Sequence, residues 1–169
     1  MKKISIGLAA IMFALAGCVG QVIETTVPFD PNEVSYITKR GTATIEGQAF
    51  LRQRGGGIVT CAGFEVILIP AGQFATERMT QIYGSRDGGR INVFGGANQE
   101  NVDPRYLQMT RKTTCDAEGD FEFREVSNGA YYVFTTVTWQ VGNSIVPEGG
   151  GLARRVEVNG NRDVRVLLN

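Results

Sequence analysis

The chain has 169 residues, which suits one domain with short extensions, and its 43% hydrophobic content is enough to build a core. Its 17 basic residues balance its 17 acidic residues, so the charge gives no indication of a nucleic-acid partner. The chain contains no histidine, which excludes Ser-His-Asp and Cys-His catalysis and removes a frequent zinc ligand. No spacing supports a Ser–Lys or a paired-carboxylate scheme, so we expect a protein that is not an enzyme and needs no cofactor.

The first 18 residues have the pattern of a bacterial signal peptide. Two lysines precede an apolar run over residues 4–15, which is too short for a membrane span of about 20 residues. The segment Leu15-Ala16-Gly17-Cys18 resembles the lipobox of bacterial lipoproteins. This resemblance implies cleavage after Gly17 and acylation of Cys18, with palmitate among the acyl groups. The alternative is an ordinary secretory signal peptide whose apolar segment ends in a cysteine.

This interpretation makes residues 1–17 a lipoprotein signal peptide and residues 18–41 a lipidated N-terminus and tether. Several acyl chains on one cysteine would anchor the protein firmly to a membrane. In the enterobacterial sorting rule, aspartate after the lipidated cysteine retains a lipoprotein in the inner membrane, so Val19 favours the outer membrane. We therefore expect a Gram-negative cell-envelope protein, lipid-anchored at the periplasmic face of the outer membrane. Pro28 and Pro31 disfavour regular structure in the tether, although residues 34–38 suit an edge strand.

From residue 42 onward, short apolar stretches alternate with glycine-rich turns. Residues 42–51 predict a first core strand, in which Gly47 marks a bulge or a close backbone approach, and residues 64–69 predict a central strand. The glycine run 55–57 lacks the Lys-Ser/Thr that a phosphate-binding loop requires, so it predicts a flexible connection. Residues 73–83 contain no glycine or proline and predict a short helix.

Residues 84–105 form a long, polar, glycine-rich connection. Together with the predicted helix, they make an insertion over about residues 73–105. A connection of this length in a compact domain is usually either functional or disordered. Residues 84–105 are therefore the best candidate for a partner-facing element, and the alternative is a mobile insertion without a role.

The C-terminal half predicts five further strands, at residues 106–114, 121–124, 131–139, 152–158 and 162–168. Alternation with polar neighbours predicts that Phe121, Phe123, Tyr131 and Val133 are buried. The last two strands are expected to form a hairpin, because Asn-Gly between two alternating runs is a strong hairpin signal. About seven short strands with glycine-rich turns indicate an all-β antiparallel sandwich.

Cys61 and Cys115 remain once Cys18 is assigned to lipid. An even pair of cysteines in an oxidising compartment predicts a disulfide. The bridge would close a loop of about 55 residues, which contributes roughly 4 kcal/mol in the chain-entropy description. The alternative is two separate buried thiols. A metal site is disfavoured, because two cysteines without histidine or a short Cys-x-x-Cys spacing make a poor ligand set.

Two further groups of residues each have two interpretations. Asp116, Glu118 and Asp120 bring three carboxylates together as calcium ligands would, but the same residues make a good turn, and the turn is favoured. Trp139 and Tyr132 would stack on a sugar ring if they were exposed. Trp139 shares a strand face with other apolar residues, so core packing is favoured for it.

Three motifs resemble the carboxypeptidase regulatory-like domain. They are an Ala-Gly pair before a Val-x-Leu strand (Ala62, Gly63, Val66, Leu68), an Asp-x-x-Gly-x-Phe-x-Phe turn and strand (Asp116, Gly119, Phe121, Phe123), and Gly-x-Tyr-x-Val (Gly129, Tyr131, Val133). The resemblance covers residues 42–169, apart from the insertion. It implies a seven-stranded antiparallel Greek-key β-sandwich of the prealbumin (transthyretin-like, Cna-B-like) type, to which the sequence adds one short helix and the long glycine-rich insertion.

Members of that family are usually non-catalytic modules, so the motifs carry information about fold rather than activity. The Lys–Asn isopeptide bond of related adhesin units is not expected, because the mature chain has only Lys39 and Lys112. We expect a lipid-anchored envelope protein that presents a structural or protein-binding module to another envelope protein. The alternative function is a carbohydrate-binding module that recognises peptidoglycan or a surface glycan.

Overall fold

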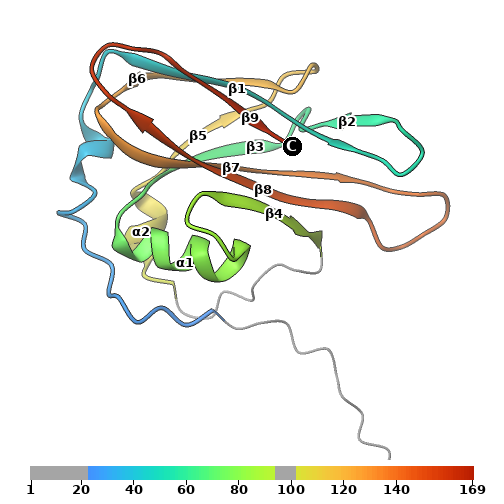
Figure 1. Cartoon of the computed structure of the whole chain (residues 1–169), viewed down its shortest axis with the longest axis horizontal. Coiled ribbons are helices and arrows are strands. Elements are labelled where there is room, and N and C mark those ends of the chain that lie inside the picture. The colour runs from blue at the N-terminus through green and yellow to red at the C-terminus, as the bar shows by residue number, and fades with distance from the viewer. Residues whose placement is uncertain (1–22, 94–101) are drawn as a thin grey trace, which may run out of the picture.

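The structure, a computed structural model, describes residues 23–93 and 102–169. The predicted signal peptide and the predicted lipidation site at Cys18 lie outside the described residues, as does part of the predicted insertion. No helix in the described ranges is long and apolar enough to span a membrane. The strands form two sheets that pack face to face (Figure 1), which confirms the predicted all-β sandwich.

The first sheet is built around β1 (Ala43–Arg52). Strand β6 (Asp120–Val126) pairs with β1 in the antiparallel direction, and β9 (Val164–Leu168) pairs with it in the parallel direction. The short strand β2 (Ile58–Thr60) pairs with the end of β1. This sheet forms the upper layer in Figure 1.

The second sheet contains five antiparallel strands. In spatial order they are β4 (Gly88–Asn92), β8 (Glu148–Val158), β7 (Gly129–Trp139), β3 (Glu65–Pro70) and β5 (Arg111–Thr114). The described residues thus contain nine strands, whereas the sequence predicts about seven. The two additional strands, β2 and β4, form within glycine-rich segments that are predicted to be connections, because each finds a paired neighbour in the folded sheets.

The predicted hairpin at the C-terminal end is wrong. Strand β8 pairs with β7 over its whole length and with β4 over residues 150–154, whereas β9 forms its ladder with β1. The chain turns at Gly160, which has a φ of +71°, and crosses to the first sheet, where β9 lies parallel to β1. A similar crossing separates β6 from β7, which belong to different sheets. The turn signals therefore locate the reversals of the chain but not the strand pairs.

The predicted helix over residues 73–83 is confirmed as α1 (Gln73–Tyr83). It ends at Gly84, which adopts a φ of +69°, a left-handed conformation that glycine accepts without steric cost. Phe74 and Met79 bury one side of α1 against the outer face of the second sheet, in a cluster that includes Tyr132. Figure 1 shows the helix below this sheet.

Two segments predicted to be strands are helical instead. Residues 34–38 form the 3₁₀ helix η1 (Ser35–Thr38) rather than an edge strand. The first part of the predicted strand 106–114 belongs to α2 (Pro104–Gln108). Asp103 caps α2 by accepting the Arg105 N–H at 2.9 Å, and the following proline has no N–H that needs a partner, so both residues favour a helix start.

The main core lies between the sheets and contains the four side chains that are predicted to be buried. Phe121, Phe123, Tyr131 and Val133 are respectively 5%, 3%, 1% and 0% exposed. Tyr131 keeps its hydroxyl satisfied at the edge of this core by donating a hydrogen bond to the Ser127 carbonyl at 2.8 Å. The predicted register of the central strands is thus confirmed.

Cys61 and Cys115 form a disulfide inside the main core, with their Cα atoms 5.7 Å apart. The bond joins the loop before β3 to the end of β5. Helix α1, strand β4 and helix α2 all lie between the two cysteines in the sequence. The disulfide therefore closes the base of this long excursion and ties both of its ends to the sandwich.

The N-terminal segment (residues 23–34) packs against the domain instead of forming a free tether. Ile23, Phe29 and Val34 are respectively 5%, 8% and 2% exposed. The carboxylate of Glu77 on α1 accepts the backbone N–H of Thr26 at 2.9 Å. The prolines keep the segment irregular, as predicted, but its apolar side chains bury themselves beside α1.

Candidate functional site

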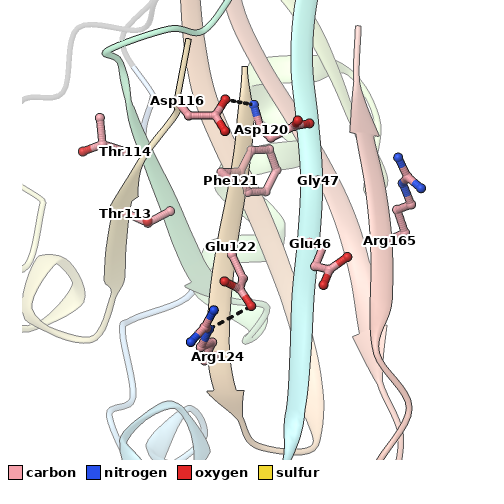
Figure 2. Close-up of a pocket in the computed structure, with 10 residues that line it drawn as sticks. All are labelled: Glu46, Gly47, Thr113, Thr114, Asp116, Asp120, Phe121, Glu122, Arg124 and Arg165. Carbon is pink, nitrogen blue, oxygen red and sulfur yellow. Dashed lines mark hydrogen bonds and ion pairs between the residues drawn. The ribbon is translucent and has the colours of Figure 1, made fainter. Parts of the chain in front are cut away.

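A wide polar groove with a volume of about 690 Å³ lies on the first sheet beside β5 (Figure 2). Its lining comes from four strands and from the turn before β6: Glu46 and Gly47 of β1, Thr113 and Thr114 of β5, Asp116, Asp120, Phe121, Glu122 and Arg124 at and along β6, and Arg165 of β9. We call this surface the polar groove. Four carboxylates and two guanidinium groups line it, so its formal charge is negative.

Strand register creates the row of charges across the groove. Glu46 lies opposite Glu122 in the β1–β6 pair and opposite Arg165 in the β1–β9 pair. Like charges directly opposite each other on a sheet are unfavourable. Arg124 relieves this repulsion through an ion pair with Glu122, at 2.9 Å between Nε and Oε1. Exposed ion pairs of this kind add little stability, so exchanging this pair for contacts with a ligand would cost the fold little. The charged row is therefore available for binding.

Asp116 is used by the turn before β6 rather than by a metal site. Its Oδ1 accepts the backbone N–H of Glu118 at 3.0 Å and that of Asp120 at 2.8 Å. Figure 2 shows the bond from Asp120 as a dashed line. In the part of the chain that the structure describes, no group of three or more potential ligands is arranged to hold a metal ion. The geometry thus supports the turn interpretation of Asp116, Glu118 and Asp120.

Gly47 allows the floor of the groove to close over the core. A Cβ at Gly47 would lie 2.4 Å from Cζ of Phe121, so the glycine is required by a close approach, one of its two predicted roles. The ring of Phe121 is 5% exposed and belongs to the core. The polar groove therefore offers hydrogen-bonding groups but no exposed aromatic ring.

An apolar hollow with a volume of about 320 Å³ lies on the other side of the sandwich, between α1, α2 and the second sheet. Ile67, Met79 and Phe134 are among its lining residues. The hydroxyl of Tyr83 is buried without a hydrogen-bond partner in the described part of the chain, and burial raises the pKa of this tyrosine. Arg78, which is 4% exposed, lies 5.7 Å from the ring centre of Phe74.

The two aromatic residues considered for sugar stacking have different environments. Tyr132 is fully buried and donates its hydroxyl to the Arg86 carbonyl at 2.7 Å, so it is a core residue. Trp139 is only partly buried: it packs against the main core and also lines a third hollow at the end of the sandwich. The sequence alone does not identify the arginines that share this hollow, because those of β1 and the β1–β2 turn are far along the chain from the arginine of β4 and from Trp139.

A solved structure of a candidate carbohydrate-binding protein from Pseudomonas aeruginosa is similar to this chain, with a TM-score of 0.67 and 28% sequence identity. The similarity covers 83% of this chain and 96% of that one. No protein-family model and no curated protein matches the chain.

The similarity is therefore to a β-sandwich described as a binding protein rather than as an enzyme, and it assigns no family. The resemblance to carboxypeptidase regulatory-like domains continues to rest on the sequence motifs. Of the two functions expected from the sequence, this comparison supports carbohydrate binding better than a structural or protein-binding role.

Proposed function

We propose that this protein is a non-catalytic carbohydrate-binding module of the bacterial cell envelope. The observation that carries the proposal is the similarity to the candidate carbohydrate-binding protein, which extends over 96% of that protein's chain. The chemistry of the polar groove supports it. Carboxylates accept hydrogen bonds and guanidinium groups donate them, and sugar hydroxyl groups can do both.

The polar groove suits a glycan chain better than a single sugar. Hydrogen bonds between exposed polar groups add only about 0.5–1.5 kcal/mol each, and this groove has no exposed aromatic ring to increase the affinity. A polymer would bring several sugars into contact along the charged row. The expected ligand is therefore peptidoglycan or a surface glycan, bound weakly per sugar.

The proposal includes the lipid anchor at Cys18. From residue 18 to residue 23 the chain advances five residues, which span at most about 18 Å at roughly 3.5 Å per residue. Ile23 is buried, and the backbone carbonyl of Glu24 accepts a hydrogen bond from the side chain of Gln81 on α1 at 3.0 Å. An acylated Cys18 would thus hold the α1 side of the second sheet near the membrane, and the first sheet, which carries most of the polar groove, is the other layer of the sandwich (Figure 1).

Replacement of Cys18 by serine tests the anchor. We expect the variant chain to leave the membrane fraction or to remain unprocessed, because serine offers no thiol for acylation. Normal processing together with unchanged membrane fractionation would refute the lipoprotein assignment.

Glycan retention by the full chain, purified in detergent, tests the binding function. Immobilised peptidoglycan strands and neutral surface polysaccharides should slow its elution relative to an uncoated support. Glu122→Ala removes an acceptor from the groove and should weaken retention about five- to tenfold, the scale of one exposed hydrogen bond.

Glu157→Ala is a matched control for that variant. Glu157 forms an ion pair at 2.7 Å with Arg155, which lies two residues away on the same strand. Glu122 pairs with Arg124 in the same way, but Glu157 lines none of the hollows described above. The control should retain full glycan binding. If the full chain binds no glycan on any support, carbohydrate binding is refuted; equal loss in both variants would refute the role of the groove.

A protein-binding role is the second candidate, and exposed apolar residues favour it. Ile145 is 93% exposed and Val141 is 47% exposed in the β7–β8 turn, and Ile58 at the start of β2 is 56% exposed. Both turns project at the same end of the sandwich (Figure 1). If this end binds a protein, Ile145→Ser should abolish the recovery of a specific envelope protein with the full chain, while glycan retention persists. Unchanged recovery would exclude this end as the interface.

A further inference from the structure

A third hollow, with a volume of about 310 Å³, lies at the end of the sandwich that carries the β1–β2 and β7–β8 turns. Its lining includes Trp139, Arg52, Arg54 and Arg90. Among the described residues that line it, Glu148 supplies the one carboxylate, so three guanidinium groups face a single negative charge. We call this hollow the arginine pocket.

The three arginines converge because the end of β1 and the turn that follows it lie near the edge strand β4. Arg52 is the last residue of β1, Arg54 lies in the turn to β2, and Arg90 lies on the edge strand β4. All three are exposed. None of them forms an ion pair with any residue in the ranges 23–93 and 102–169. Three like charges held near a single carboxylate still repel one another, so a negatively charged ligand would stabilise this arrangement.

Trp139 adds an aromatic surface that is held in place. It ends strand β7, where it lies opposite Glu148 of β8, and its ring packs against the main core. Its indole N–H is buried and has no acceptor in the described part of the chain. A ring that the core already immobilises can stack on a ligand with little further loss of entropy.

We propose that the arginine pocket binds the carboxylate-bearing sugar of an acidic glycan, that is, a uronic acid. The guanidinium groups would hold the carboxylate in charge-assisted hydrogen bonds, and the indole would cover the apolar face of the sugar ring. That the ligand is a sugar rests on the proposed function. That it is an anion rests on the charges of the pocket itself.

The two polar surfaces of the molecule would therefore bind glycans of different charge. Four carboxylates against two guanidinium groups line the polar groove, whereas the arginine pocket has three guanidinium groups and one carboxylate. An acidic glycan is repelled by the first and attracted by the second. The arginine pocket thus determines the preference for acidic glycans over neutral glycans of equal length.

Titration of the full chain with an oligogalacturonate and with a neutral oligosaccharide of the same length tests the proposal. The oligogalacturonate should bind at least tenfold more tightly at low ionic strength, and salt should weaken its binding more than that of the neutral sugar. Arg54→Gln and Arg90→Gln should each weaken oligogalacturonate binding roughly five- to tenfold, the scale of one charge-assisted contact.

Arg162→Gln is the matched control, because it removes the same charge from an exposed position in the turn before β9 that lines none of the hollows described above. It should bind the oligogalacturonate as the unmodified chain does. Trp139→Phe keeps a smaller aromatic ring, and Trp139→Ala removes the ring. Both should bind less tightly, the alanine variant more so, and thermal melting of each variant checks that it is folded.

The possible results separate this inference from the proposed function. Equal binding of acidic and neutral oligosaccharides would overturn the arginine pocket and leave carbohydrate binding intact. Failure to bind either class would overturn both. Inorganic phosphate and vesicles of anionic phospholipid are tested in the same way. If either binds as tightly as the oligogalacturonate, and Arg54→Gln weakens that binding equally, the inference is overturned, because the pocket would then recognise phosphate rather than a sugar acid.

Discussion

Replacing Gly47 with alanine should destabilise the sandwich, because β1 crosses the core at this point without room for a side chain. The added Cβ would lie 2.4 Å from Cζ of Phe121 and 2.6 Å from the backbone oxygen of Val166. The phenylalanine ring can tilt away from the new methyl group. The Val166 carbonyl cannot retreat easily, since β9 is held against β1 in a ladder from Ile45 to Ala49.

The size of the effect follows from two opposing contributions. Overpacking in a well-packed core costs about 1–3 kcal/mol. Alanine in a strand loses less conformational entropy than glycine on folding, which returns roughly 0.5–1 kcal/mol. We therefore expect Gly47→Ala to lower the free energy of unfolding by about 1–2 kcal/mol.

Urea unfolding with the disulfide intact measures this change, and Gly55→Ala is the control. A Cβ at Gly55 would have no heavy atom within 4 Å, so this variant should be at least as stable as the unmodified protein, with a gain of up to about 1 kcal/mol. Adding Phe121→Leu to Gly47→Ala should recover part of the loss, because it removes the tip of the ring. A Gly47→Ala variant that is as stable as Gly55→Ala would show that β1 is not tightly packed against Phe121 and β9.

Three further predictions concern other parts of the fold. The backbone N–H groups of the N-terminal segment, Thr26 first, hold the pKa of Glu77 below its usual value. A lowered pKa in the folded state means that this contact stabilises the segment above the pKa of the unfolded state and is lost as the pH falls. The protection factors of the amides of residues 26–27, that is, their exchange rates relative to an unfolded peptide at the same pH, should accordingly fall below about pH 4.5. Glu77→Gln should show reduced protection already at neutral pH, and identical protection in both proteins at every pH would contradict this. Denatured, unreduced protein should show no titratable thiol from Cys61 and Cys115. Reduction of the disulfide should lower the free energy of unfolding by roughly 4 kcal/mol, and an unchanged melting temperature after reduction would reject a stabilising bridge. Finally, Phe123→Ala should lower the free energy of unfolding by about 3–5 kcal/mol, because this side chain is 3% exposed in the core, and a loss below 1 kcal/mol would disprove its packing.

The sequence by itself determined the local conformation in much of the chain. Residues 73–83 lack glycine and proline, and they form α1 over that range. Phe121 and Phe123 alternate with polar neighbours, and both are buried. These features depend on side-chain periodicity and turn chemistry within a few residues, which can be read from neighbouring positions. The pairing of Cys61 with Cys115 followed from counting, since only two cysteines remained.

Strand pairing and the composition of the surface sites were decided only by the tertiary structure. Strand β9 pairs with β1, more than a hundred residues earlier in the chain, whereas its neighbour in sequence, β8, pairs with β7 and, over residues 150–154, with β4. The sequence of the N-terminal segment predicts a tether, and its apolar residues are buried only because α1 provides a surface against which they pack.

The polar groove and the arginine pocket have the same origin. The groove joins Glu46 to Arg165, and the pocket joins Arg52 to Trp139. Each of these residues, taken alone in the sequence, is an ordinary charged or aromatic strand residue. Their proximity depends on the register between strands and on the packing of the two sheets, and the energy of such long-range contacts is not encoded in the local pattern around any one residue.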